Sequence, residues 1–433
     1  METLKKIANK ILEDAKAQGI DFAACVVSEG ETQEFNVAAG EFSLMRTLFD
    51  KEISLSVYKD NKKGSVAMTG FDEDKLHGLV LDACAAAESS EPDEAWEIDN
   101  SGRHERFTAG ALEGDLDKLF QRTKELVSDV KRDYPKILIE EGLSEYSRGK
   151  TVYANTFGTL YEVEKGNYEY ELMFSGHDGD EGSSFNAAGV TMENLDTPFI
   201  ELGMLRRDLE DAENQIHTET IDEKFVGTAV FTPTALGQVV FGTILGNYIS
   251  DRPLIEGTSP WADKLGQKVC DERISLRLAP HDEKVVCGAS FTGEGYLTED
   301  FDVIKNGILK SFWIGQYGAN KLGLKRSGNT SYNGIVEPGD KSLEEIIAGI
   351  DKGIVFGRFS GGSPAPSGEF SGVAKNSFLI ENGKITKALS ETMVSGNLTD
   401  MLFKLVDISS EVKEDGSSSS PYMAFDGLTI SGK

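Results

Sequence analysis

The sequence predicts an α+β protein, in which N-terminal α/β sheet units are followed by a mostly antiparallel β C-terminal domain with a few helices. Three observations support this fold class. Apolar residues recur at helical spacing near the N-terminus, alternating apolar and polar segments follow, and glycine-broken β segments dominate from residue 225 onward. Because 433 residues can bury a sizeable core, we expect two or three domains.

The first predicted unit, residues 1–100, begins with an amphipathic helix that ends near Gly19. An antiparallel sheet follows, after which Asp72 is placed to cap a second helix. The acidic stretch 88–99 contains a proline and has the composition of a linker. The strands predicted for this unit are residues 22–27, 35–38, 53–58 and 64–69.

The second predicted unit, residues 101–222, contains a helix from Asp115 to about Asp133, because apolar side chains fall on one helical face there. Turn sequences separate the strands that follow it. A polar, helix-like stretch at 197–220 is expected to bridge to the last domain. The strands predicted for this unit are residues 137–139, 152–154, 160–163 and 168–174.

The third predicted unit, residues 223–433, is rich in strands. Asn306-Gly307 and Asn382-Gly383 each separate two aliphatic runs, which is the sequence favoured by a two-residue type I′ turn. We therefore predict two equivalent hairpins; one motif does not decide whether they arose by duplication. Asn397 and Asp400 are placed to cap a short helix.

Composition narrows the classes of partner. The formal charge of -29 repels polyphosphate, over a Debye length of roughly 10 Å, so we expect no direct nucleic-acid binding. The sequence has no apolar run of about 18 residues, and its first residues lack the features of a signal peptide. We expect a cytoplasmic protein that does not associate with membranes.

The sequence offers little for metal or nucleophilic chemistry. None of its five histidines has a second histidine at ligand spacing, and the pair His104-Glu105 falls in a predicted linker. Residues 177–182 briefly resemble a cation loop but lack the ligand pattern of an EF-hand, which favours a solvated turn. Neither a nucleophile elbow nor a phosphate loop is present.

A helix that starts with Thr-Pro and several glycine-broken segments follow one another in the last domain. The helix is residues 232–247, and the later segments include Gly357-Arg358-Phe359-Ser360-Gly361, Gly368-Glu369-Phe370-Ser371-Gly372, Phe378-Leu379-Ile380-Glu381-Asn382-Gly383 and Val394-Ser395-Gly396-Asn397-Leu398. Together they resemble the carboxy-terminal half of the TldD/PmbA family, in its PmbA (TldE) branch. This family was once described as a modulator of DNA gyrase.

The resemblance implies a non-catalytic subunit. In the catalytic branch, the matching helix carries a His-Glu-x-x-x-His zinc site and a later cysteine completes the ligands. Here residues 241–247 contain neither histidine nor carboxylate, and no cysteine follows Cys287. We therefore expect no catalytic residue, no metal ligand and no cofactor in this chain, and zinc in a TldD-type partner.

Two residues are candidates for a cavity or an interface. Asn247 is the polar side chain near the end of the matching helix, and Arg358 is the strong cation of the glycine-rich segment 357–372. Arg358 is suited to pair with a carboxylate of a partner or of a peptide terminus; the alternative is a solvated side chain in a turn-rich edge.

Three functions stay open at this point. The first is a scaffold subunit that pairs with a zinc-bearing TldD-type subunit in a peptidase for peptide maturation and for degradation of unfolded peptides. The second is a stand-alone peptide- or protein-binding module that forms a homodimer when alone. The third is an independent hydrolase with an unrecognised site.

Overall fold

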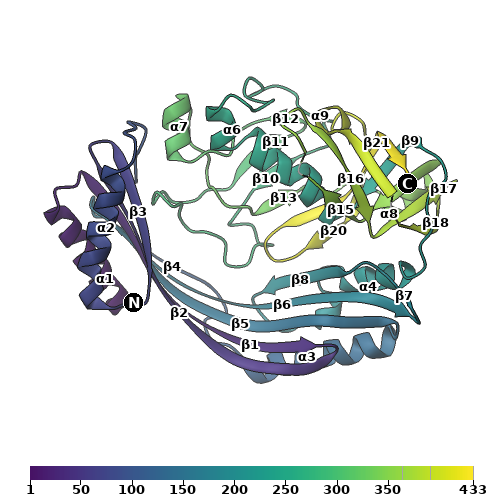
Figure 1. The fold of residues 1–433 in the computed structure, drawn as a ribbon, viewed down its shortest axis with the longest axis horizontal. Helices are drawn as coiled ribbons and strands as arrows, with labels where there is room; N and C mark the ends of the chain where they lie inside the picture. The colour runs from purple at the N-terminus through teal and green to yellow at the C-terminus, as the bar shows by residue number, and fades with distance from the viewer. Residues whose placement is uncertain (363, 391, 433) are drawn as a thin grey trace.

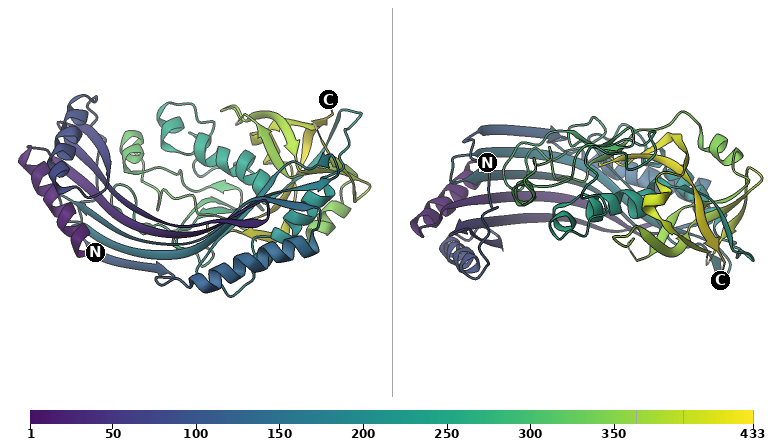
Figure 2. Two further views of the ribbon diagram at one scale, coloured as in Figure 1. Left: turned by 60° about the horizontal axis from the view of Figure 1, so that its bottom comes forward. Right: turned by 90° about the horizontal axis from the view of Figure 1, so that it is seen from above.

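The computed structural model describes residues 1–362, 364–390 and 392–432. Figure 1 shows a long, curved N-terminal sheet, with the C-terminal domain on its concave side. Strands make up more of the chain than helices do, and the two sheets are antiparallel or mixed, which confirms the predicted α+β class. Figure 2 shows the same two layers from two further directions.

Four long strands build the N-terminal sheet: β1 (Phe22–Ala38), β2 (Glu41–Lys59), β5 (Ile137–Asn155) and β6 (Leu160–Asp178). They lie in the order β3-β2-β1-β5-β6-β4, with β3 (Lys62–Thr69) and β4 (His104–Gly110) at the ends. Two short strands, β7 (Glu181–Gly182) and β8 (Asn186–Met192), also pair with β6. Strands from both residues 1–100 and residues 101–222 therefore share one sheet.

These strands are much longer than the sequence pattern predicts. Residues 28–34 of β1 are polar apart from one glycine, yet they pair with β2 and with β5 throughout. The alternation of apolar and polar residues disappears there because neither face of the sheet is deeply buried at this point. The hydrogen bonds between strands are made by backbone groups, so strand pairing continues even where the side chains do not alternate.

Helices cover the two ends of this sheet. α1 (Glu2–Ala17) and α2 (Leu76–Glu88) pack at one end, where their apolar faces join a core with β1, β2 and β5. α3 (Leu116–Asp133) covers the convex side at the other end (Figure 1), and α4 (Leu205–Asn214) contributes to the same hydrophobic core. The predicted opening helix and the helix from residue 115 are both confirmed, and the Asp115 side chain accepts a hydrogen bond from the Lys118 N–H.

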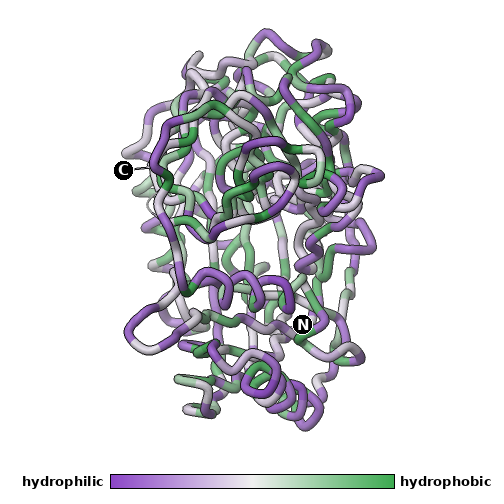
Figure 3. The backbone as a smooth tube through the Cα atoms, turned by 90° about the vertical axis from the view of Figure 1, so that its right-hand side faces the viewer, coloured by the Kyte–Doolittle hydropathy of each residue, from purple (hydrophilic) through white to green (hydrophobic). Residues whose placement is uncertain are grey.

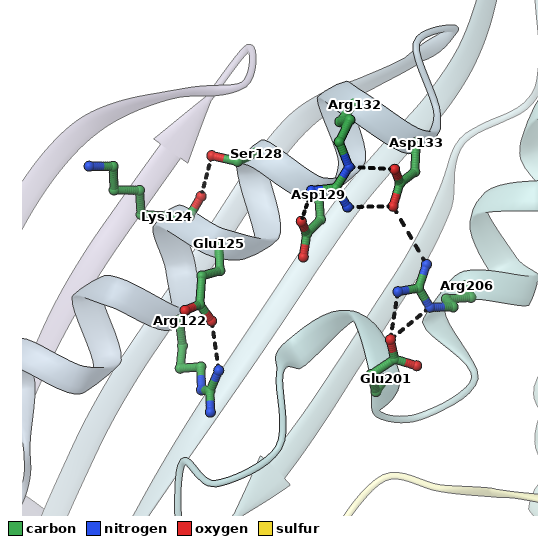
Figure 4. Close-up of polar contacts among 9 residues, drawn as sticks. All are labelled: Arg122, Lys124, Glu125, Ser128, Asp129, Arg132, Asp133, Glu201 and Arg206. Atoms are coloured by element: carbon green, nitrogen blue, oxygen red, sulfur yellow. Dashed lines mark hydrogen bonds and ion pairs between the residues drawn. The ribbon is translucent and has the colours of Figure 1, made fainter.

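Figure 4 shows how α3 is tied to the segment that leads into α4. Arg132 pairs with Asp129 and Asp133, and Asp133 also lies 3.8 Å from Arg206, which pairs with Glu201. These charges are partly or fully exposed, so each pair adds little stability, and together they link the two segments. In Figure 3, many of the outer loops and helices are hydrophilic, and hydrophobic stretches lie mainly in the interior of the molecule.

The C-terminal sheet has the order β12-β11-β10-β13-β21-β9-β14-β17-β18 along its main path. Its pairs are antiparallel except β13 with β21 and β14 with β9. The strands are β9 (Phe225–Phe231), β10 (Leu276–Leu278), β11 (Phe301–Lys305), β12 (Ile308–Leu309), β13 (Gly334–Val336), β14 (Lys352–Phe356), β15 (Arg358–Gly361), β16 (Glu369–Lys375), β17 (Ser377–Glu381), β18 (Lys384–Leu389), β19 (Thr392–Asn397), β20 (Leu405–Glu414) and β21 (Ser419–Ser431).

The turns and caps of this domain follow the sequence closely. Asn306 and Gly307 have φ values of 49° and 74°, and Asn382 and Gly383 have values of 51° and 75°. Both pairs connect antiparallel strands, so the two predicted type I′ hairpins are confirmed. Asn397 caps the short helix α9, as predicted, whereas Asp400 lies within that helix and does not cap it. The helices are α5 (Pro233–Ala235), α6 (Asp251–Ile255), α7 (Gln316–Leu322), α8 (Leu343–Ala348) and α9 (Leu398–Met401).

The acidic segment predicted as a linker packs tightly between the two layers. Trp96 stacks on Tyr317 of α7 with ring centroids 4.0 Å apart, and Asp93 accepts a hydrogen bond from Tyr317 and pairs with Lys321 at 2.9 Å. Through these contacts, the segment connects the C-terminal domain to the N-terminal sheet. In the part of the chain that the structure describes, no helix is both long enough and apolar enough to cross a membrane.

Candidate functional site

The helix that carries the family resemblance begins at Pro233, as the sequence predicts. The Thr232 hydroxyl accepts a hydrogen bond from the Ala235 N–H and donates one to the Gly357 carbonyl at 2.6 Å. After α5 the chain continues as two π-helical segments, Leu236–Phe241 and Ile244–Tyr248. π-Helical turns are rare in proteins, and those that occur are often found at functional sites.

One face of this helix lies in the core, and the exposed face consists mainly of glycine residues. The buried face packs against Phe231, Phe356 and Phe425 of the C-terminal sheet. The exposed face presents Gly237, Gln238, Gly242 and Gly246. A Cβ placed on Gly237 or Gly246 would meet no atom within 4 Å, so another chain can approach the backbone closely there.

The glycine-rich segment 357–372 runs along this helix as the strands β15 and β16. The Phe359 N–H donates to Oε1 of Gln238 at 2.9 Å, and Nδ2 of Asn247 donates to the Pro364 carbonyl at 3.4 Å. Asn247 is half-buried against this segment. Residue 363 lies outside the described residues.

Arg358, at the start of β15, is a half-buried cation. One guanidinium nitrogen donates to the Ser184 hydroxyl at 3.3 Å, and the group lies over the Phe185 ring. Its Nε is buried and has no hydrogen-bond partner among the described residues, and no described carboxylate lies within ion-pair distance. Burial lowers the pKa of Arg358 from its ordinary value.

A cleft of about 850 Å³ lies between the concave face of the N-terminal sheet and the C-terminal domain. Pro233 and Thr234, at the start of the helix, form part of its wall. The charged groups around it are Glu141, Glu171, Lys413 and Asp415. The other lining residues are Asn36, Val37, Ala38, Ser43, Gly142, Leu143, Leu172, Met173, Ala187, Ala188, Gly189, Ser418 and Ser420.

Neither of the two candidate residues is among those that line this cleft. Arg358 contacts Ser184 and Phe185, and the next residues of that segment, 187–189, line the cleft. Asn247 lies at the far end of the helix, against Pro364. Arg358 begins β15, whereas Asn247 contacts Pro364, which follows that strand.

Sequence reasoning missed the residues that line the cleft. The pair Glu140-Glu141 carries no information in so acidic a chain, yet Glu141 faces the cleft together with Glu171. Their strands pair in the register Glu141 with Met173 and Leu143 with Glu171, a relation that a single sequence does not reveal. Lys413 of β20 was also missed. It pairs with Asp208 of α4 at 3.1 Å, so this ion pair links the C-terminal domain to α4 beside the cleft.

The five histidines are exposed; His177 and His217 both lie at the β6–β7 hairpin, and the other three lie elsewhere in the fold. His77 contacts Asp14, His104 contacts the Gly158 carbonyl and His281 contacts Thr298. His104 begins strand β4, so its prediction as a linker residue is wrong, although it does lie at the surface. His177 contacts Ser175, and His217 contacts Glu181, the first residue of β7.

These positions do not fit a zinc ion. Tetrahedral zinc needs at least three converging imidazole, thiolate or carboxylate ligands. Within residues 1–362, 364–390 and 392–432, no group of three or more His, Cys, Asp or Glu side chains is arranged to hold a metal. The exposed helix face offers glycine backbone and one glutamine amide in place of such ligands.

Comparisons with known proteins agree in sequence and in fold. Residues 226–432 match the family model described as the PmbA/TldA metallopeptidase C-terminal domain. The metalloprotease PmbA of Escherichia coli O157:H7 is 25% identical over 426 residues, which cover 93% of this chain and 92% of that protein. A zinc metalloprotease TldD homolog from Saccharolobus solfataricus is 30% identical over 152 residues, 32% of this chain and 33% of the relative.

The crystal structure of TldE from Thermococcus kodakarensis has the same fold. It superposes with a TM-score of 0.85 at 20% identity and covers 98% of this chain and 100% of the other. The sequence match therefore extends over nearly the whole length of a curated relative, and the fold match does the same for a solved structure. The chain belongs to the PmbA/TldD family.

Proposed function

We propose that this protein is a PmbA/TldE-type subunit without catalytic residues, which pairs with a zinc-bearing TldD-type subunit to form a metallopeptidase for unfolded peptides. The observation that carries the proposal is the exposed face of the helix at residues 237–246. It lies where the resemblance places the zinc helix, and it offers Gly237, Gln238, Gly242 and Gly246. Neither an imidazole nor a carboxylate is available there to bind zinc or activate water.

In this proposal the chain contributes walls to a peptide cavity. The cleft beside the helix start is large enough for several side chains of an extended peptide. Three carboxylates and one lysine surround it, a balance that favours neutral or basic peptide segments. Arg358 and Asn247 are proposed cavity or interface residues, and the exposed part of the Arg358 guanidinium is proposed to bind a carboxylate.

The zinc is assigned to the partner chain. Support comes from the names of the relatives, since one of them is a zinc metalloprotease TldD homolog. Peptide maturation in the cytoplasm is the proposed setting, and neither nucleic acid nor membrane is a proposed partner of this acidic chain.

The test combines the purified chain with a zinc-bearing family partner. We expect no cleavage of an unfolded peptide by this chain alone, and chelator-sensitive cleavage after mixing in a complex of one copy of each. A partner whose zinc-helix glutamate is replaced by glutamine is the matched control and should bind without cleaving. Chelator-sensitive cleavage by this chain alone, in a preparation free of any partner, would contradict the proposal.

The second candidate is a stand-alone homodimeric module that binds peptides or proteins without cleaving them. The observation that favours it is the exposed apolar edge of β2, which can support association of the chain with itself. Binding of a fluorescent unfolded peptide by the isolated chain, unchanged by the zinc-bearing partner, would support this function over the first.

A further inference from the structure

A second pocket lies in the C-terminal domain, where the segment after α7 meets β11 and the end of β12 (Figure 1). Its volume is about 580 Å³, and sites for small ligands usually have about 300–1,000 Å³. The pocket shares no lining residue with the cleft between the two layers. It is therefore a separate candidate for ligand binding.

The charge of this pocket is opposite to that of the chain as a whole. Its charged lining residues are Lys310, Lys325, Arg326 and one acid, Glu299. None of the three cations forms an ion pair within the part of the chain that the structure describes, although the chain has 73 acidic residues against 44 basic ones. Three cations without carboxylate partners create a local positive potential, which attracts an anion.

The segment that carries two of these cations is fixed by backbone contacts. The Ser327 N–H donates to the Ile314 carbonyl at 3.0 Å, and the Glu299 N–H donates to the Gly328 carbonyl at 2.9 Å. Gly328 also lies so close to the neighbouring segment that a Cβ there would be 2.6 Å from the Glu299 carbonyl oxygen. These contacts order the segment in advance, so a ligand does not have to do so when it binds.

Arg326 is held in place by an aromatic ring. Its guanidinium carbon lies 4.3 Å from the centre of the Tyr296 ring, and one guanidinium nitrogen donates to the Ser327 carbonyl at 3.2 Å. The Tyr296 hydroxyl in turn donates to Oε1 of Glu97 at 3.2 Å. A guanidinium group has several N–H donors, and the hydrogen bond to Ser327 leaves the others of Arg326 without an acceptor in the described part of the chain.

Apolar side chains line another part of the same pocket. Phe301 is half-buried and Phe312 is buried there. Two leucines, Leu265 and Leu324, also line the pocket and are 44% and 39% exposed. Because removal of apolar surface from water is favourable, the pocket suits a ligand that joins an anionic group to an apolar one.

We propose that this pocket binds the C-terminal residue of a peptide, with the carboxylate at the three cations and an apolar side chain against the two leucines. Hydrogen bonds from arginine or lysine to a carboxylate are among the strong ones in proteins. Glu299 and the net charge of -29 oppose a second negative charge, so a carboxylate fits better than a phosphate. In a chain of a metallopeptidase family, a peptide is the ligand that carries both groups. The inference concerns binding by this chain and does not depend on the proposed pairing with a zinc-bearing subunit.

Two forms of one peptide test the role of the carboxylate. The probe is a short peptide of glycine and serine that ends in leucine and carries a neutral fluorophore at its amino end. We expect the form with a free carboxylate to bind the isolated chain in fluorescence polarisation, and the C-terminal amide to bind at least about tenfold more weakly. Added salt should weaken the binding of the free carboxylate form. Equal binding of both forms, or saturable binding of neither, would overturn the inference.

Two double variants with the same change in charge locate the site. Lys310→Ala/Lys325→Ala should raise the Kd of the free carboxylate form at least about tenfold. Both lysines are exposed and form no ion pair in the described part of the chain, so the thermal midpoint should hold. The matched control is Lys6→Ala/Lys16→Ala, at two exposed positions of α1, and it should bind as the wild type does. An equal loss in both double variants, or no loss in the first, contradicts the inference.

Glu299→Gln should change the affinity in the opposite direction. It removes the one acid among the charged lining residues, so the Kd of the free carboxylate form should fall about threefold or more. A purely structural role of the pocket residues would not tighten binding. An unchanged or higher Kd in Glu299→Gln would show that no carboxylate binds beside this residue.

Octanoate and inorganic phosphate serve as competitors that identify the kind of anion. Neither should displace the labelled peptide at concentrations where the unlabelled peptide does. Displacement by octanoate at a lower concentration would assign the pocket to a fatty acid, and displacement by phosphate would assign it to a small inorganic anion; either result overturns the inference. All these measurements record binding without cleavage, so failure of this site and failure of the proposed peptidase function are distinguishable.

Discussion

The guanidinium carbon of Arg358 lies 4.4 Å from the centre of the Phe185 ring. This contact joins the glycine-rich strand β15 of the C-terminal domain to the segment between β7 and β8 of the N-terminal sheet. Cation–π contact and one hydrogen bond to Ser184 leave the Nε of Arg358 without a partner among the described residues. A half-buried cation with spare donors is suited to bind a carboxylate from outside the chain.

Replacing Arg358 by alanine should therefore weaken the complex with a zinc-bearing partner, or its peptidase activity, by at least about tenfold, since charged hydrogen bonds contribute about 1.5–3 kcal/mol. Titration calorimetry and peptide cleavage measure the two effects. Arg358→Lys keeps the positive charge but lacks the planar guanidinium group, so the loss of partner binding or activity should be smaller than in Arg358→Ala. Unchanged partner binding and activity in Arg358→Ala would leave Arg358 as a solvated residue of a turn-rich edge.

The purified chain should hold no stoichiometric zinc. Its exposed histidines have separate partners, and the helix in the position of the family zinc site has no ligand. Elemental analysis after dialysis against a chelator measures this, with a zinc-bearing TldD-type chain treated in parallel as the positive control. One zinc per chain that survives dialysis would contradict the prediction.

Asp211 of α4 should make the stability of the protein depend on pH. The pKa of Asp211 is raised to about 6, chiefly by burial; Arg207 at 3.9 Å lowers it, and the neighbouring acids Asp208 and Glu210 raise it. The unfolded pKa is about 3.9, so between about pH 4 and pH 6 the folded state binds more protons than the unfolded state. This group therefore favours folding at low pH, and its contribution is lost as pH rises through about 6.

Asp211→Asn removes that titration. Relative to wild type, the variant should gain more free energy of unfolding at pH 8 than at pH 5, as measured by urea denaturation at both values. Glu223→Gln, which changes an exposed carboxylate outside α4, is the control and should show the same small difference at both pH values. An equal effect of Asp211→Asn at pH 5 and pH 8 would rule out the raised pKa.

Gly64 of β3 should tolerate no side chain. A Cβ there would lie 2.0 Å from the Ala83 carbonyl oxygen and 2.4 Å from the Ala87 nitrogen of α2. Gly64→Ala is expected to lower the free energy of unfolding by about 1–3 kcal/mol, because the helix must move away from the sheet.

Gly78, in the same helix α2, is the matched control. A Cβ there meets no atom within 4 Å, so Gly78→Ala should raise the free energy of unfolding by up to about 1 kcal/mol through helix propensity. Urea unfolding of the two variants beside wild type measures both effects. A Gly64→Ala chain as stable as wild type would show that α2 does not pack on β3 as described.

Local signals in the sequence predict local features well. Asn382-Gly383 predicts the turn between β17 and β18, Asn397 predicts the cap of α9, and the apolar spacing from Leu4 onward predicts α1. Each of these features depends on neighbours within a few residues. The length of β1 was not predictable, because residues 28–34 are polar on a lightly buried sheet. The cleft was not predictable either, since Asn36, Glu141 and Lys413 meet only through strand pairing across the whole chain.

The pairing of β1 with β5 also has a consequence for the order of folding during synthesis. β1 finds β2 close by in sequence, but Ala24 pairs with Asn155 and Ala38 with Glu141, so the inner edge of β1 stays unpaired until the chain has reached β5. Contacts of such long sequence separation slow folding. We expect ribosome-bound chains that end near residue 100 to protect amide hydrogens in α1 and in the β2–β3 pair, and those of β1 that face β5 only after residue 155 has emerged. Full protection of β1 in the shorter chains would contradict this order.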